Sequence, residues 1–193
     1  MTARTHTRII DWAHSDLVRN RTARRAVGVV AFAVATAFGA RVAVPMPGNL
    51  VPITLQVLAV LLAGALLGPR LGAASQLLYV AVGAMGAPIF AAGGGLAYLL
   101  GPTGGYLLAF PLAAYAVGAV SGRSGGVLRL LLGLVIGVAL ILVAGASWLA
   151  VLTGDLEQAV RLGVLPFVAN DLVEIALALV ISFRLRPRAL QLF

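Results

Sequence analysis

The sequence predicts an all-α protein, a polytopic membrane protein built as a bundle of six transmembrane helices. Three observations support this: 61% of the 193 residues are hydrophobic and 10% are charged, the apolar residues form long unbroken runs, and arginines stand near the ends of these runs. A soluble domain is closer to half apolar and a quarter charged, so a water-exposed fold could not bury this much apolar surface. The runs also lack the alternation over about ten residues that marks a transmembrane β-barrel.

Glycine and proline clusters divide the apolar residues into six segments. A helix needs about 20 residues to cross the bilayer, so the chain has room for roughly five to seven crossings. The expected spans are Ala26–Val44, Ile53–Leu67, Leu71–Ile89, Tyr106–Val120, Val127–Leu152 and Val164–Phe183. A six-helix domain over residues 23–186 is therefore expected between a basic N-terminal tail (1–22) and a short C-terminal tail (187–193).

The arginines predict the orientation of these spans. If the N-terminus is cytoplasmic, the basic residues of both tails lie inside, together with Arg70, Arg123 and Arg129. Only Arg41 and Arg161 then fall outside, which is the asymmetry that the positive-inside rule describes. We therefore expect a multi-pass protein of a bacterial plasma membrane, surrounded by the lipid bilayer, with both termini in the cytoplasm.

Several kinds of chemistry are missing from the sequence. There is no cysteine and no lysine, and both histidines precede the first span. A thiolate site, a P-loop and an intramembrane histidine are therefore excluded. The net charge of +8 lies at the ends of apolar runs rather than along an aromatic and basic groove. We expect no enzymatic activity, no cofactor, no metal and no nucleic-acid partner.

Three polar residues stand out in the last span: Asn170, Asp171 and Glu174. A carboxylate at the centre of a membrane helix costs about 2.5–3.5 kcal/mol, and such groups usually face the interior of the bundle. Asp171 and Glu174 are three residues apart and share a helical face. Counted from Val164, Asp171 lies about 10 Å below the outer end of the span, a depth that suits the floor of an outward-facing pocket.

Two alternatives remain open for this cluster. It could be structural, paired with Arg41 or Arg161 on the outer side. It could also be a proton relay in a small proton-coupled carrier, because two neighbouring carboxylates cannot both ionise easily. Such carriers usually have repeated halves and several ionisable groups, neither of which this chain shows.

Several stretches together resemble one known family. They are "VPITLQ" at 51–56, "LGPRLG" at 67–72, "GAPIFA" at 86–91, "GPTGGYL" at 101–107, and Asp171 followed by "IALA" at 175–178. In this order they resemble the BioY family of biotin transporters, which are the biotin-binding S components of energy-coupling factor (ECF) transporters. The resemblance extends from Pro45 to Ala178, most of the chain.

The resemblance implies a six-helix subunit that captures biotin from outside for import. It implies a transmembrane coupling subunit and an ATPase pair as partners, or self-association in members that act without the ATPases. Docking in the family partly uses an alanine-rich face of the first helix. Here that face would consist of Ala31, Ala33, Ala35 and Ala37.

One departure from the family concerns the ligand. In the last helix of the family an aspartate and, three residues later, a lysine contact biotin. Asp171 matches the acid, but Glu174 replaces the lysine. An aspartate can accept from the ureido N–H groups, whereas a glutamate could donate to the ureido oxygen only when protonated. The biotin carboxylate would prefer a cation, for which Arg41 is the candidate. A related ligand other than biotin, or weakened binding, remains an alternative.

The remaining candidate residues come from the loops and helices around the expected pocket. Thr54 and Gln56 are expected to orient the ligand, with Asn170 beside them. Aromatic contacts are expected from Tyr79, Tyr98 and Tyr106. Glycine-rich residues 93–106 are expected to form an ordered lid that includes Gly94 and Thr103, because irregular backbone at membrane depth must be covered by protein.

Overall fold

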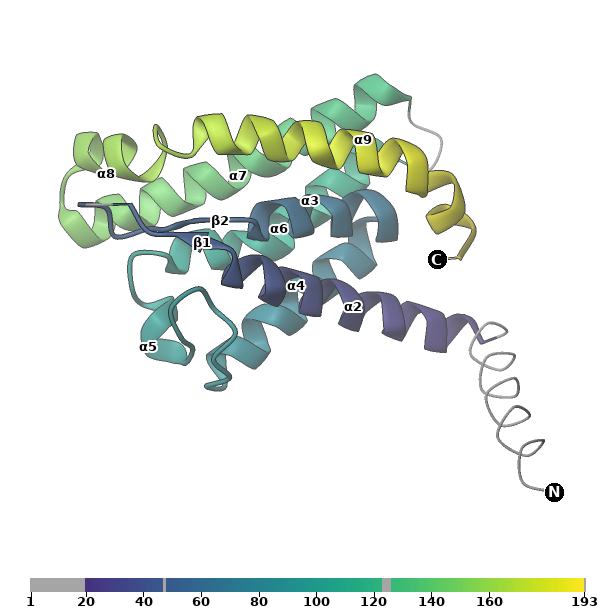
Figure 1. Cartoon of the computed structure of the whole chain (residues 1–193), viewed down its shortest axis with the longest axis horizontal. Coiled ribbons are helices and arrows are strands. Elements are labelled where there is room, and N and C mark those ends of the chain that lie inside the picture. The colour runs from purple at the N-terminus through teal and green to yellow at the C-terminus, as the bar shows by residue number, and fades with distance from the viewer. Residues whose placement is uncertain (1–19, 47, 123–125, 193) are drawn as a thin grey trace.

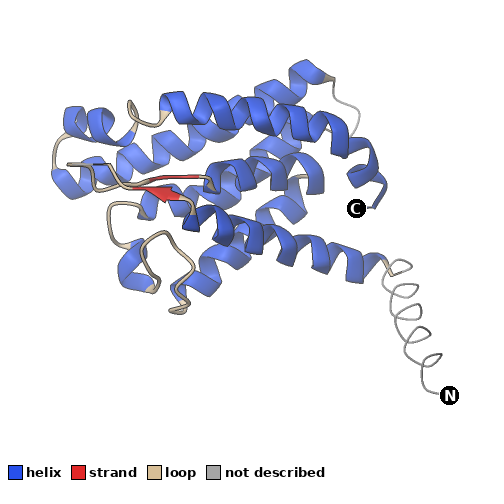
Figure 2. Ribbon diagram, viewed as in Figure 1, coloured by secondary structure: helices blue, strands red, loops and turns tan. Residues whose placement is uncertain are grey.

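The computed structural model describes residues 20–46, 48–122 and 126–192, and these form a bundle of helices with one short β-hairpin (Figures 1 and 2). The helices are α2 (Arg21–Arg41), α3 (Gln56–Leu67), α4 (Pro69–Ala84), α5 (Leu96–Leu99), α6 (Gly104–Ser121), α7 (Val127–Thr153), α8 (Leu156–Gly163) and α9 (Val168–Leu192). The hairpin pairs β1 (Ala43–Val44) with β2 (Ile53–Thr54) in antiparallel register. The six predicted spans correspond to α2, α3, α4, α6, α7 and α9, so the helical bundle is confirmed.

The six helices differ in length. Within the described residues, α2, α6 and α7 are long and apolar enough to cross a membrane, and α8 with α9 forms a fourth candidate bent by 48°. By contrast, α3 has 12 residues, which rise only about 18 Å against a hydrocarbon core of about 30 Å. The predicted span Ile53–Leu67 was too long because Ile53 and Thr54 pair with β1 instead of entering the helix.

Three further helix ends differ from the predicted spans. The first span ends at Arg41 because Ala43 and Val44 form β1, and the third ends at Ala84, where the chain turns at Met85 and Gly86. The last helix continues to Leu192, so the expected tail at 187–193 is helical over its described residues. The expected N-terminal tail, 1–22, lies largely outside the described residues; at its end the Asn20 side chain caps α2 by accepting from the backbone of Thr22 and Ala23.

Small residues allow the helices to pack closely. A Cβ at Gly64 in α3 would collide with the carbonyl of Ala114 in α6, and one at Gly118 would collide with Pro69 at the start of α4. One at Gly137 in α7 would lie 3.0 Å from the Leu61 side chain. Close approach through small residues is a common way for membrane helices to associate.

Large apolar side chains cover much of the outer surface, including Phe38, Leu128, Val143, Val151, Leu172 and Phe183. A soluble monomer rarely exposes apolar surface this extensively, so lipid is the expected surrounding. Polar side chains are instead found inside: Thr36 in α2 donates to Gln76 in α4 at 3.1 Å, and both are fully buried. Buried polar groups need such partners, so this bond ties α2 to α4.

The bundle has two different ends. At one end lie the hairpin, α5 and α8, and at the other lie the start of α2 and the end of α9 (Figure 1). The second end is rich in arginine, because Arg186 of α9, Arg70 of α4 and Arg25 of α2 line one hollow there. The hairpin end carries the pocket described next.

Candidate functional site

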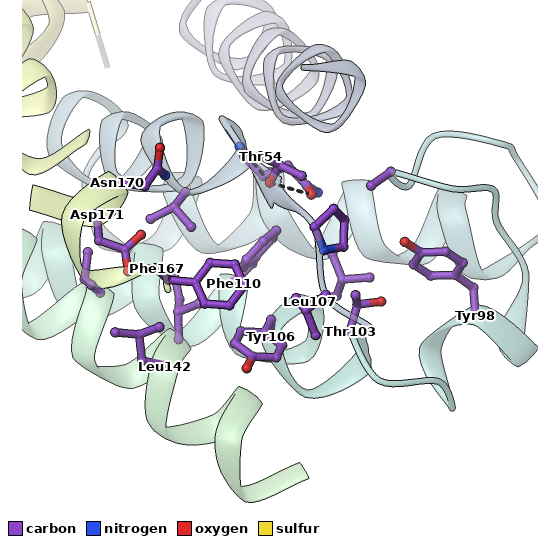
Figure 3. A pocket seen from close by; sticks show the side chains of 17 residues that line it. Thr54, Tyr98, Thr103, Tyr106, Leu107, Phe110, Leu142, Phe167, Asn170 and Asp171 are labelled. Atoms are coloured by element: carbon purple, nitrogen blue, oxygen red, sulfur yellow. Dashed lines mark hydrogen bonds between the residues drawn. The ribbon is translucent and has the colours of Figure 1, made fainter. Parts of the chain in front are cut away.

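A pocket opens at the hairpin end between α3, α6, α7 and α9 (Figure 3). Its cavity volume is about 50 Å³, and the space that includes its open mouth is about 610 Å³. Its lining comprises Val51, Pro52, Thr54, Gln56, Val57, Ala91, Tyr98, Thr103, Tyr106, Leu107, Phe110, Val138, Ile141, Leu142, Phe167, Asn170 and Asp171. The walls are mainly apolar with a few polar groups, the pattern expected for a binding site with a defined ligand orientation.

Asp171 is the only acidic residue among these lining residues. It is only 5% exposed, and its side chain points among the lining residues (Figure 3). No hydrogen bond to its carboxylate comes from the described part of the chain. Residues 164–167 form a turn and α9 begins at Val168, so Asp171 lies in the first turn of this helix and not about two turns below its start. A helix N-terminus favours a negative charge, so this position lowers the cost of an ionised carboxylate.

Asn170 lines the pocket beside Asp171, and its side chain also contacts Glu174. Its side-chain amide donates to Glu174 Oε1 at 3.1 Å. Glu174 is fully buried and does not line the pocket, and within the described residues its Oε2 has no hydrogen-bond partner. Glu174 was expected to contact the ligand, but it is not among the lining residues. Its carboxyl group instead accepts a hydrogen bond from the Asn170 amide.

A chain of hydrogen bonds orders the polar wall contributed by β2 and α3. The Thr54 hydroxyl donates to Gln56 Oε1 at 3.1 Å, and Gln56 Nε2 donates to the Tyr79 hydroxyl at 2.6 Å. That hydroxyl donates in turn to the carbonyl of Ile89 at 3.2 Å. Thr54 and Gln56 line the pocket, whereas Tyr79 is buried behind them. Tyr79 therefore positions Gln56 and does not contact the pocket, contrary to the expectation of a ring contact.

Aromatic rings form much of the apolar wall. Tyr106 and Phe167 lie with their ring centroids 6.1 Å apart, and the Tyr106 hydroxyl donates to the Gly163 carbonyl at 2.7 Å. This bond fixes the start of α6 against the end of α8. Phe110 adds a further ring from the next turn of α6. Such rings offer a large apolar contact to the body of a ligand.

Two loops cover the mouth. In the hairpin connection the Asn49 amide donates to the Leu162 carbonyl of α8 at 2.8 Å, and Val51 and Pro52 line the pocket. Residues 90–104 supply Ala91, Tyr98 and Thr103. The Trp148 indole donates to the Gly101 carbonyl at 2.9 Å, which holds the second loop against α7. Residues 93–106 thus comprise short loops, α5 and the start of α6, and their role as a lid stays a prediction.

Two further candidates lie outside the pocket. Arg41 is exposed, donates to the carbonyl of Pro88 and is not among the lining residues of the pocket. Gly94 packs on the backbone of Ala87, where a Cβ would collide, and therefore has a structural role. The structure thus brings together Thr54, Gln56, Tyr98, Thr103, Tyr106, Asn170 and Asp171, and leaves Arg41, Tyr79, Gly94 and Glu174 outside the lining.

Sequence reasoning missed the apolar lining residues of α6, α7 and the turn before α9. Phe110, Val138, Ile141, Leu142 and Phe167 belong to this group. Their runs are apolar on all sides, so hydropathy does not distinguish the side chains that face the pocket from those that face lipid.

The four alanines of α2 do not share one face. Ala31 and Ala35 are exposed, whereas Ala33 is 7% exposed and belongs to the core cluster against which Ala37 packs. Alternate residues of a helix point in nearly opposite directions, which separates the two pairs. The docking prediction therefore applies only to Ala31 and Ala35.

The fold and the pocket define a helical membrane protein with a mainly apolar pocket at one end of its bundle. No group of three or more His, Cys, Asp or Glu side chains that could hold a metal occurs in the described residues. The family model for the BioY family matches residues 11–191, so the chain belongs to the BioY family.

Its relatives and a solved structure agree with this assignment. The chain is 44% identical over 159 residues to the probable biotin transporter BioY of Pyrococcus horikoshii, covering 82% of this chain and 93% of the relative. It is 37% identical over 149 residues to the biotin transporter BioY of Thermotoga maritima, covering 77% and 87%. A crystal structure of the S-component for biotin from an ECF-type ABC transporter matches with a TM-score of 0.76 and 25% identity, covering 97% of this chain and 95% of that one.

Proposed function

We propose that this chain is the membrane-embedded substrate-binding subunit of a biotin uptake transporter. The observation that carries the proposal is the Asp171 carboxylate, which is buried, faces an apolar pocket and receives no hydrogen bond from the described residues. A buried carboxylate without a donor is costly. A ligand that brings N–H donors on an apolar body would supply what this pocket lacks, and the ureido ring of biotin has these properties.

The proposed pose follows the length of the pocket. Asp171 and Tyr98 lie at opposite ends of the lining (Figure 3). The ureido ring would lie at Asp171 and Asn170, with the apolar ring and chain against Phe110 and Leu142. The ligand carboxylate would then reach the hydroxyl groups of Tyr98 and Thr103, because the described lining residues include no Arg, Lys or His.

In the proposed pose the ligand carboxylate contributes less to the binding affinity than the ureido ring does. Biotin methyl ester should therefore bind within about tenfold of biotin, because a hydrogen bond to a charged group contributes about 1.5–3 kcal/mol and a neutral ester retains part of it. Loss of all ester binding would instead indicate a cation at the mouth and would contradict the pose.

The orientation and partners are also proposed. The arginines near the start of α2, at Arg70 and near the end of α9 favour that end as the cytoplasmic side of a cell membrane, with both termini inside. The pocket then faces outward. Import would require a coupling subunit and an ATPase pair, with Ala31 and Ala35 as the docking stripe on α2, or alternatively self-association.

The direct test is a calorimetric titration of the purified protein in lipid nanodiscs with biotin, and with thiamine as a vitamin that lacks the ureido ring. Saturable binding of biotin alone, without ATP or a proton gradient, is expected for a binding subunit. Binding of neither vitamin would contradict the proposal. Uptake that an uncoupler abolishes, in cells that lack the ATPases, would favour a proton-coupled carrier instead.

A further inference from the structure

A second hollow lies at the opposite end of the bundle. Its cavity volume is about 490 Å³. Three arginines from three helices line it: Arg25 of α2, Arg70 of α4 and Arg186 of α9. Its wall also contains the apolar side chains Leu67 and Leu71, at the turn between α3 and α4.

The charged side chains among the described lining residues of this hollow are all arginines. The described acidic residues are Asp155, Glu157, Asp171 and Glu174, and none of them is among its lining residues. Three guanidinium groups around one hollow repel one another. An anion between them would relieve this repulsion.

The three arginines differ in their burial and hydrogen bonding. Arg186 is buried and donates to the carbonyls of Ser121 and Gly122 at the end of α6, which fixes its guanidinium at the inner wall. Arg25 and Arg70 are exposed and lie at the mouth. The hollow therefore combines one anchored cation with two that can adjust to a ligand.

The start of α4 adds a further contribution. Gly68 and Pro69 line the hollow at the N-terminus of this 16-residue helix. The positive end of the helix dipole and the unpaired backbone N–H groups of the first turn favour an anion. Guanidinium groups are the preferred protein partners of phosphate oxygens, because their N–H groups match phosphate geometry.

We propose that this hollow binds the phosphate of an anionic phospholipid headgroup. The hollow lies at one end of a membrane-embedded bundle, the level at which headgroups occur, and basic pockets between membrane helices commonly bind such headgroups. Leu67 and Leu71 provide apolar contact for the start of an acyl chain. A soluble phosphate has the same anionic chemistry and is the other source to be distinguished.

The test compares two double variants of the purified full chain in neutral detergent. R25Q/R70Q removes two arginines of the hollow, and R129Q/R184Q removes two exposed arginines that do not line it. Phosphatidylglycerol and phosphatidylcholine are titrated, with lipid retention in native mass spectrometry and the shift of the unfolding midpoint as readouts. The apparent affinity for phosphatidylglycerol should fall about fivefold per arginine in R25Q/R70Q, whereas R129Q/R184Q should resemble wild type.

A third arm uses inorganic phosphate and glycerol 3-phosphate without lipid. Stabilisation by phosphatidylglycerol alone supports a headgroup, and equal stabilisation by inorganic phosphate supports a phosphate site with a soluble source. Equal affinity in R25Q/R70Q and wild type, or equal losses in the two double variants, would overturn the proposal. Equal binding of phosphatidylcholine would overturn it as well.

Discussion

The side-chain amide of Gln56 donates a 2.6 Å hydrogen bond to the hydroxyl of Tyr79, and this bond connects the pocket wall to the interior of the bundle. Gln56 lines the pocket, and Tyr79 is fixed between Phe90 and Phe110 by ring contacts. The orientation of a polar group in the pocket therefore depends on a residue that lies outside it.

The first prediction concerns Tyr79→Phe. Removing the hydroxyl leaves the Gln56 amide without its acceptor and the Ile89 carbonyl without its donor, so the protein should lose about 1–3 kcal/mol of stability. Biotin binding should weaken less than it does in a variant of Asp171. Thermal unfolding and calorimetry provide the two readouts. Tyr115→Phe is the matched control, because Tyr115 is exposed on the outer surface of α6; equal effects of the two changes would contradict the prediction.

The second prediction concerns Gly145→Ala in α7. A Cβ at this position would collide with the ring of Tyr106, which lines the pocket. Overpacking of this kind costs about 1–3 kcal/mol, and displacement of the ring should also break its bond to the Gly163 carbonyl and weaken biotin binding. Gly126→Ala is the control, because nothing lies within 4 Å of a Cβ there. Unchanged biotin affinity in a folded Gly145→Ala protein would contradict a role for Tyr106 in the wall.

The third prediction concerns Glu174→Gln. A glutamine retains an oxygen that can accept from Asn170, and it removes a carboxyl oxygen that has no partner in the described residues. Biotin affinity should therefore stay within about threefold of wild type, with equal or higher stability. Calorimetry in nanodiscs measures the affinity. A loss as large as that expected for Asp171→Asn would mean that Glu174 contacts the ligand itself.

The fourth prediction concerns Ala35→Trp on the exposed stripe of α2. The large side chain should leave biotin binding unchanged but reduce ATPase-dependent uptake, because it separates α2 from the proposed coupling subunit. Val143→Trp places the same bulk on the exposed surface of α7 and should have no effect. Normal uptake in Ala35→Trp would contradict docking through this stripe.

The fold was predictable because hydrocarbon imposes a strict rule on sequence: apolar runs of helical length, separated by Gly and Pro, must be helices. The shortening of α3 was not predictable from hydropathy. Ile53 and Thr54 are β-branched and suit a strand, but hydropathy does not separate them from the apolar run that follows. Their pairing with Ala43 and Val44 places them in the hairpin.

The pocket was predictable at Asp171 because a carboxylate in a membrane helix needs a polar or ligand-accessible environment. Glu174 differs because a separation of three residues rotates a side chain by about 60° around the helix and moves it about 4.5 Å along the axis. This places the two carboxylates in different surroundings. Phe110 and Phe167 could not be predicted as pocket residues from the sequence, because equally apolar neighbours in the same segments face lipid.

The decisive measurement is a calorimetric biotin titration of wild type, Asp171→Asn and Asp155→Asn in lipid nanodiscs. Asparagine removes the charge and turns an N–H group toward the donors of the ligand, so Asp171→Asn should weaken binding at least about tenfold, equivalent to a loss of about 1.5 kcal/mol or more. Asp155 caps α8 and does not line the pocket, and asparagine is an equally good cap, so Asp155→Asn should bind as wild type does. Wild-type affinity in a folded Asp171→Asn protein would contradict the assignment of Asp171 as the ligand-binding carboxylate.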